Sequence, residues 1–177
     1  VYTRAGDTFG AEEALSFEIG GKFTLQDGAA QLNVALFRTE FDDLQTATVT
    51  PQGAVTVVNA AAAVTQGVET DLTWRLTEAV TVGGAYAWLD AYYDDSDELS
   101  CGGYMLKLRQ TAGEDFSTTP CTYRLDDMPN GDDTLQRAPE HTATLWGEYY
   151  APVADGWDLQ VYGSLNYRDE TSTTRDN

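Results

Sequence analysis

Apolar and polar residues alternate along several long stretches of the chain. In residues 66–76 (QGVETDLTWRL) the large apolar residues share one parity, whereas the charged residues share the other. Successive side chains of a β-strand point to opposite faces, so this pattern predicts a strand with one apolar and one charged face. A soluble sandwich would turn the apolar face to a core, whereas a membrane barrel would turn it to lipid and the charged face to a wet lumen.

Strand-like segments recur along the chain. The pattern predicts strands near residues 14–25, 30–41, 63–76, 79–93, 139–151 and 157–170. In the second and fourth of these segments, apolar residues occupy both parities. The pattern therefore does not decide which of their residues lie on the apolar face. Short turn signals such as QDGA, which carries Asp-Gly, alternate with two long connections, expected over residues 42–61 and 94–138.

This alternation of short and long connections favours a membrane barrel over a sandwich. In an antiparallel meander it places every short turn at one end and every long loop at the other, as bacterial outer-membrane barrels do. Strands of roughly 10 to 14 residues also suit a tilted membrane span better than an ordinary globular strand. Several Trp and Tyr residues lie towards strand ends, as in interfacial girdles, although aromatic residues also pack ordinary sheets.

Composition narrows the classes of partner. The 177 residues include 29 acidic and 10 basic ones, a net charge of −19. Nucleic acids and anionic membrane surfaces are bound through clusters of Lys and Arg, so we expect no nucleic-acid partner. The aromatic fraction of 11% argues against a disordered acidic tail. No segment approaches the roughly 20 consecutive apolar residues of a transmembrane helix.

The residues do not indicate an enzyme. The single histidine, His141, follows Glu140 at the start of an expected strand, where a plain polar role is simpler than a catalytic or metal-binding one. The sequence has neither the nucleophile elbow of a hydrolase nor the glycine spacing of a phosphate loop. Its carboxylates do not define a pocket for a two-acid mechanism. We therefore expect neither catalysis nor a cofactor.

The connection over residues 94–138 carries the remaining candidate chemistry. A disulfide between Cys101 and Cys121 would contribute about 3 kcal/mol in the chain-entropy model and fits an oxidising cell surface; free thiols are the alternative. Calcium prefers several oxygen ligands, and the candidates are Asp94, Asp95, Asp97 and Glu98, with a solvated acidic loop as the alternative. Three aromatic residues could contact a ligand or pack the loop on itself: Tyr104, Phe116 and Tyr123.

Four segments resemble the C-terminal part of the β-barrel of TonB-dependent outer-membrane receptors. They are SFEIGGKFTLQDGAAQLNVALFRTEFDDLQ, VNAAAAVTQGVETDLTWRL, TVGGAYAWLDAYY and APEHTATLWGEYY. The order and spacing of the motifs make the resemblance specific, and it covers most of the chain outside residues 94–137. The matching positions are Glu18, Gly20, Lys22, Asn33, Ala35, Phe37, Asp42 to Gln45, Asn59, Ala60, and Gly67 to Glu69.

The resemblance implies an all-β fold, an antiparallel meander of about six long strands that forms part of a 22-stranded transmembrane barrel with a plug domain. Six strands cannot close such a barrel, so the chain would be a fragment of it. The resemblance further implies a bacterial outer-membrane location and active uptake of a scarce solute: a ferric siderophore, cobalamin or an oligosaccharide. The implied partners are outer-membrane lipid, the plug domain with the remaining strands, and a TonB-type energy-transducing complex.

On this interpretation the two parities have different surroundings. The lipid-facing candidates are Phe17, Ile19, Val68, Leu72, Trp74, Leu159, Val161 and Leu165. The lumen-facing candidates are Glu18, Lys22, Glu69, Asp71, Arg75, Asp158, Gln160 and Asn166. The alternative is a secreted acidic all-β binding or adhesion module, stabilised by one disulfide, in which the charged face is an ordinary solvated surface.

Overall fold

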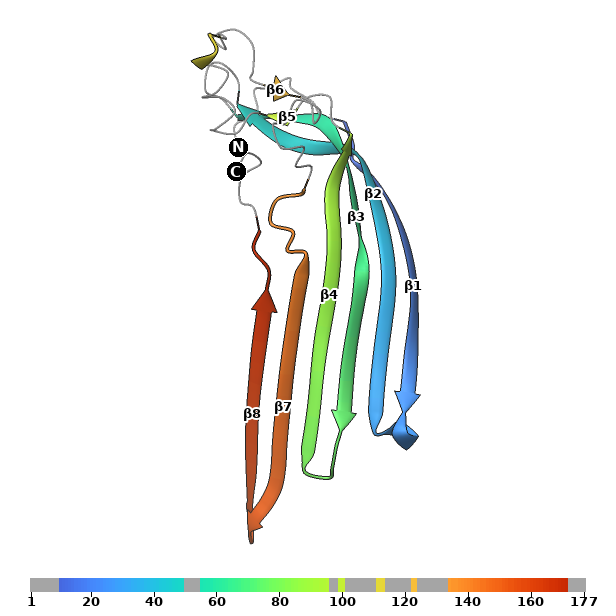
Figure 1. Cartoon of the computed structure of the whole chain (residues 1–177), viewed down its shortest axis with the longest axis vertical. Helices are drawn as coiled ribbons and strands as arrows, with labels where there is room; N and C mark the ends of the chain where they lie inside the picture. Colours follow the sequence, from blue (N-terminus) through green and yellow to red (C-terminus); the bar gives the residue numbers. More distant parts are fainter. Residues whose placement is uncertain are drawn as a thin grey trace.

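Six long strands form one antiparallel sheet, with strand order β1-β2-β3-β4-β7-β8 (Figure 1). The computed structural model describes residues 10–49, 55–95, 99–100, 111–113, 122–123 and 134–171. The strands are β1 (Glu13–Leu25), β2 (Ala30–Val49), β3 (Val55–Arg75), β4 (Val80–Asp95), β7 (His141–Ala154) and β8 (Trp157–Arg168). Each long strand pairs with the next one along the chain, which confirms the predicted meander. Within the described residues, no helix is long and apolar enough to cross a membrane.

Short turns join the strands at one end of the sheet, the lower end in Figure 1. The 3-10 turn η1 (Gln26–Gly28) joins β1 to β2, and Gly28 adopts a φ of 91° that suits a residue without a Cβ. In the β3–β4 turn, the Thr77 hydroxyl accepts hydrogen bonds from the N–H groups of Ala79 (3.1 Å) and Val80 (3.0 Å). These local bonds explain why the four residues 76–79 suffice to reverse the chain between β3 and β4.

At the other end, β2 and β3 continue further than the sequence pattern predicted. The long connection expected over residues 42–61 is wrong for most of its length, because β2 runs to Val49 and β3 begins at Val55, with these two residues paired. The ladder shifts register between Phe41 and Leu44, which is a β-bulge. A bulge inserts an extra residue, so odd-numbered and even-numbered residues exchange faces beyond it. The alternation of apolar and polar residues therefore breaks there, and the sequence resembles the start of a loop.

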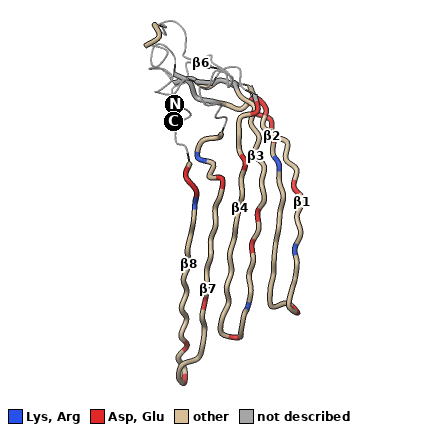
Figure 2. Tube along the Cα trace, viewed as in Figure 1, with Lys and Arg blue, Asp and Glu red and all other residues tan. Residues whose placement is uncertain are grey.

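The second long connection contains a short ladder of its own. Strand β5 (Leu99–Ser100) pairs with β6 (Thr122–Tyr123). Just before β7, the N–H of Leu135 donates a hydrogen bond of 2.9 Å to the carbonyl of Ala91 in β4. The chain therefore returns to the edge of β4 before β7 begins. Charged residues gather at this loop end of the sheet (Figure 2).

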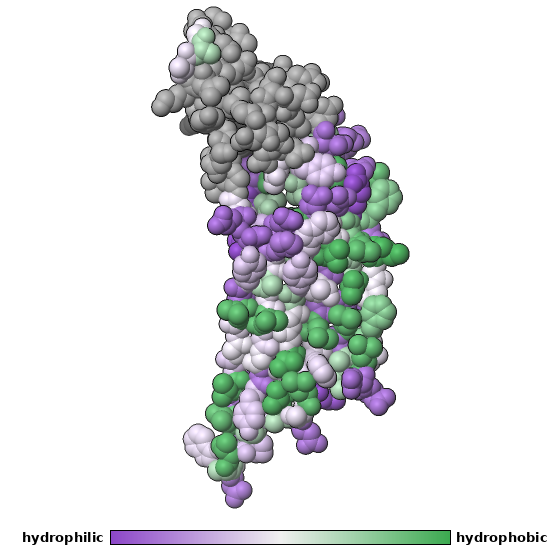
Figure 3. Space-filling view, viewed as in Figure 1, coloured by the Kyte–Doolittle hydropathy of each residue, from purple (hydrophilic) through white to green (hydrophobic). Residues whose placement is uncertain are grey.

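Burial is concentrated at the loop end. Ala61, Ala63 and Tyr93 form a buried cluster against which Phe41 and Leu44 pack. Along the rest of the sheet, large apolar side chains remain exposed, and Figure 3 shows them spread over the strands. The largest exposed fractions belong to Trp157 (73%), Ile19 (72%) and Leu165 (69%). Among the described residues, no second layer covers these side chains, in contrast to a β-sandwich.

Candidate functional site

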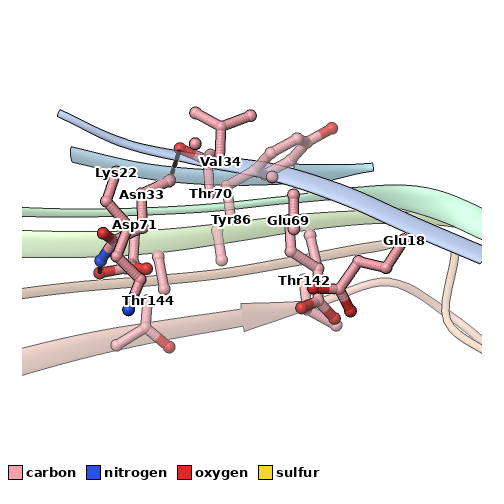
Figure 4. Close-up of a pocket in the computed structure, with 16 residues that line it drawn as sticks. Glu18, Lys22, Asn33, Val34, Glu69, Thr70, Asp71, Tyr86, Thr142 and Thr144 are labelled. Atoms are coloured by element: carbon pink, nitrogen blue, oxygen red, sulfur yellow. Dashed lines mark hydrogen bonds between the residues drawn. The ribbon is translucent and has the colours of Figure 1, made fainter. Parts of the chain in front are cut away.

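The strand register brings charged and polar side chains of β1, β2 and β3 to one face of the sheet. Lys22 pairs with Asn33, and Asn33 pairs with Asp71, so the three share a face. Figure 4 shows Val34, Thr70 and Tyr86 pointing to the opposite side. We call the side that carries Lys22, Asn33 and Asp71 the carboxylate face. Its members in Figure 4 are Glu18, Lys22, Asn33, Glu69, Asp71, Thr142 and Thr144.

The carboxylate face is hollowed. A depression of about 590 Å³ extends across β1, β2, β3, β4 and β7 (Figure 4). Its floor consists of small residues, because their side chains leave space between the polar ones: Gly20, Ala35, Ala85 and Ala87. The charged residues of β1 and β3 and the threonines of β7 stand around this floor. A hollow of this kind suits contact with a polar surface or a polar solute.

Hydrogen bonds hold part of this polar surface in place. The Asn33 amide donates a hydrogen bond of 2.8 Å to Asp71 Oδ1, and the Thr144 hydroxyl donates one of 2.9 Å to Asn166 Oδ1. The other end of the Asn33 amide, Oδ1, is buried without a hydrogen-bond partner among the described residues. A buried acceptor without a hydrogen-bond donor carries a free-energy cost.

Towards the short turns, the carboxylate face becomes aromatic. The Trp146 indole lies against Gly83, where any Cβ would overlap the ring. Its ring stacks on Tyr162, with centroids 6.3 Å apart. The sequence interpretation did not single out these aromatic residues. The available signal was parity, since Trp146 has the same parity as Thr142 and Thr144, which are polar.

The opposite side of the sheet is the apolar face, which we define by the eight lipid-facing candidates and the residues paired with them. Ile19 pairs with Leu36, which pairs with Val68, and Leu145 pairs with Leu165. The register places all eight candidates on this side and all eight lumen-facing candidates on the carboxylate face. It also decides the facing of the segments that the pattern left open.

The whole chain, residues 1–177, matches the family model described as TonB dependent receptor-like, beta-barrel. The chain belongs to the TonB-dependent receptor family. This membership and the six-stranded meander confirm the expected fold as part of a receptor barrel, while the full number of strands stays a prediction. The family is one of transporters and receptors and is not an enzyme class.

Relatives of this receptor chain include two curated proteins. The chain is 28% identical over 163 residues to the probable TonB-dependent siderophore receptor PiuA of Acinetobacter baumannii. The matched region covers 92% of this chain and 19% of that protein. It is 29% identical over 109 residues to the metal-pseudopaline receptor CntO of Pseudomonas aeruginosa, covering 62% of this chain and 15% of that protein. The chain therefore spans less than a fifth of the length of either relative.

Two solved structures share the fold of the receptor chain. The crystal structure of the siderophore receptor PiuA from Acinetobacter baumannii matches with a TM-score of 0.61 at 24% identity, over 90% of this chain and 19% of that one. The ferric-catecholate import receptor Fiu from K12 E. coli, in its closed form, matches with a TM-score of 0.50 at 22% identity, over 81% of this chain and 16% of that one.

In the receptor chain, polar side chains end the apolar face at its loop end. Arg38 donates a hydrogen bond of 2.7 Å to Gln66 Oε1, and Gln66 donates one of 2.9 Å to Asp90 Oδ2. On the next strands, Tyr86 and His141 share a hydrogen bond of 2.9 Å between the hydroxyl and Nδ1. His141 is thus part of a polar rim. Hydrogen-bonded polar and aromatic side chains are typical of a membrane–water boundary.

The candidate residues of the second long connection divide between described and undescribed parts of the chain. Cys101, Cys121, Tyr104, Phe116, Asp97 and Glu98 lie outside the described residues. Tyr123 forms part of β6, and Asp94 and Asp95 end β4. Among the described residues, no three His, Cys, Asp or Glu side chains lie together in a way that could hold a metal ion. The disulfide and the calcium site therefore stay predictions.

Proposed function

We propose that this chain is part of the wall of an outer-membrane receptor for active uptake of a scarce solute. The observation that supports this proposal is a single sheet with an exposed apolar face and a hollowed carboxylate face on its opposite side. The named relatives are receptors for metal-pseudopaline and for siderophores, which favours a metal chelate over cobalamin or an oligosaccharide as the solute.

Outer-membrane lipid is the proposed partner of the apolar face. Full burial of one Leu, Ile or Phe side chain is worth about 1.5–3 kcal/mol, and a soluble protein rarely exposes a large continuous apolar patch. Hydrocarbon around the apolar face would satisfy these side chains without a second layer of protein. A secreted adhesion module would need a cover for the same side chains, and the described residues provide none.

The carboxylate face is proposed to line the lumen, where the plug domain and the passing solute would contact it. The exposed carboxylates of this face, Glu18, Glu69 and Asp71, would accept hydrogen bonds from these partners. Strands β1 and β8 each have one neighbour in the sheet. Unpaired strand edges in lipid cost several kcal/mol per polar group, so the remaining barrel strands would pair with both edges. A TonB-type complex would supply energy through the plug.

A disulfide in the outward connection is part of this proposal. The β5–β6 ladder pairs Leu99 with Tyr123 and Ser100 with Thr122. Cys101 and Cys121 are the next residues in sequence on the two sides of this ladder. If the ladder continued by one more pair, the two cysteines would stand directly opposite each other, where Cα separations of about 4.5–5.5 Å are within the range that a disulfide requires.

Uptake by cells that express the full-length protein tests the proposed function. We expect accumulation of iron-55 supplied as a ferric siderophore, and loss of this accumulation when the TonB protein is deleted. The protein should need detergent for extraction and should migrate differently on gels before and after heating, as folded barrels do. A β protein that is monomeric in water without detergent would overturn the proposal.

A further inference from the structure

The motif DDLQ, Asp42 to Gln45, coincides with an abrupt change in the β2–β3 ladder. Phe41 pairs with Ala63 but Leu44 pairs with Ala61, so two residues of β2 stand opposite one residue of β3. Asp43 has a φ of 55°, in the left-handed region that Asp and Asn tolerate better than other side chains. Beyond this bulge, the β2–β3 hairpin leaves the direction of the strands and turns across the upper end of the sheet (Figure 1).

The Asn59 side chain connects three parts of the chain at this bend. Its Nδ2 donates hydrogen bonds to the carbonyl of Asp43 (2.6 Å) and to the carbonyl of Gly10 (3.2 Å). Its Oδ1 accepts a hydrogen bond of 2.7 Å from the N–H of Gly10. Because an amide carries both donors and an acceptor, Asn can make all three bonds, whereas Asp lacks the donors.

Gln45 makes a second connection to the same segment. Its backbone N–H donates a hydrogen bond of 2.6 Å to Glu12 Oε1, and its Nε2 donates one of 3.1 Å to the carbonyl of Gly10. The β1–β2 ladder begins only at Glu13, paired with Asp42. The side chains therefore bind Gly10 and Glu12 to the hairpin where no ladder pair does so.

We propose that Asn59 and Gln45 form a latch, which fixes the angle at which the outer β2–β3 hairpin leaves the sheet by tying it to the segment that enters β1. The bulge supplies the bend, and the latch selects one position of the bent hairpin. Gln45 and Asn59 are also motif positions of the family resemblance, and the latch gives them a physical role. In a receptor, the latch would hold this hairpin in place at the mouth of the barrel; this role rests on the proposed function.

Amide hydrogen exchange in the full-length protein, reconstituted in lipid nanodiscs, tests the latch directly. Asn59→Ala removes three hydrogen bonds, so we expect exchange at least about tenfold faster in peptides covering residues 10–12 and 42–61. Gln45→Ala removes one side-chain bond and should accelerate the same peptides by about threefold. Peptides from β7 and β8 should exchange as in the unchanged protein.

The control is Thr77→Ala, which removes two hydrogen bonds at the opposite end of the sheet. It should accelerate exchange only around the β3–β4 turn. Unchanged exchange at residues 10–12 and 42–61 in a folded Asn59→Ala protein would overturn the latch. If Asn59→Ala does not fold, unchanged exchange of these peptides in Gln45→Ala overturns it instead. Exchange is measured without solute, so a protein that takes up no siderophore can still show the latch.

Discussion

Asn33 and Asp71 face each other across β2 and β3, and the Asn33 amide donates a hydrogen bond of 2.8 Å to Asp71 Oδ1. Lys22 is the register partner of Asn33 on the other side, so a cation, an amide and a carboxylate cross three strands in one row. The same Asn33 side chain keeps its Oδ1 buried and unpartnered within the described structure. The Asn33 side chain thus holds a neighbouring carboxylate in position on the carboxylate face.

Exchanging the two members of this pair should reveal how strongly they are coupled. Asn33→Asp places two carboxylates directly opposite each other, which we expect to lower the free energy of unfolding by about 0.5–1 kcal/mol. Asp71→Asn in the same protein restores one amide and one carboxylate, so the double variant should recover most of the loss. Denaturant titration of all four proteins in lipid measures the coupling. Additive losses in the double variant would contradict a direct interaction.

A charge on the apolar face should be far more costly than one on the carboxylate face. Leu72→Arg puts a guanidinium on the side proposed to face hydrocarbon, at an expected cost of about 2–4 kcal/mol near the bilayer midplane. Thr73→Arg is the matched control, because the next residue of β3 points to the other side. Refolding of the full-length proteins into lipid vesicles compares the two. Equal costs would place water or protein, and not lipid, against the apolar face.

The contact between Trp146 and Gly83 should make Gly83 intolerant of substitution. A Cβ at this position would overlap the indole ring, so Gly83→Ala should displace Trp146 and destabilise the barrel by about 1–3 kcal/mol. Near-ultraviolet circular dichroism and thermal melting report the displaced ring and the lost stability. Gly163→Ala is the control, because nothing lies within 4 Å of a Cβ there. A Gly83→Ala protein with unchanged spectra would show that the ring does not rest on this glycine.

The predicted disulfide has a direct chemical readout. Proteolysis of the outer-membrane protein without reductant should yield one linked pair of peptides that contain Cys101 and Cys121. Reduction should separate them and lower the melting temperature, because the unfolded chain then loses a constraint worth about 3 kcal/mol in the entropy model. Cys101→Ala with Cys121→Ala should show the same lowered melting temperature without reductant. Complete alkylation of both thiols before reduction would refute the disulfide.

Much of the strand pattern was predictable because side-chain alternation is a local property. Val68, Leu72 and Trp74 share a parity whatever surrounds them, so the two-faced character of β3 followed from the sequence. The face on which Phe37 lies could not be predicted from alternation. Phe37 is apolar, yet its register partners Glu18 and Gly67 place it on the carboxylate face. Hydropathy could not have assigned it, because the pairing partner decides the face.

The sequence alone therefore determined the meander and its two-faced strands, since alternation and turn chemistry act over short distances along the chain, and the order of its motifs carried the resemblance to a receptor barrel. The tertiary structure decided the register, and with it the hollow, the Trp146–Gly83 contact and the facing of β2 and β4. It also decided that β2 and β3 continue through the bulge at Asp42–Asp43, where a side chain from Asn59 holds the backbone. These features depend on which residues of distant segments lie opposite each other, and alternation within one segment carries no information about that pairing.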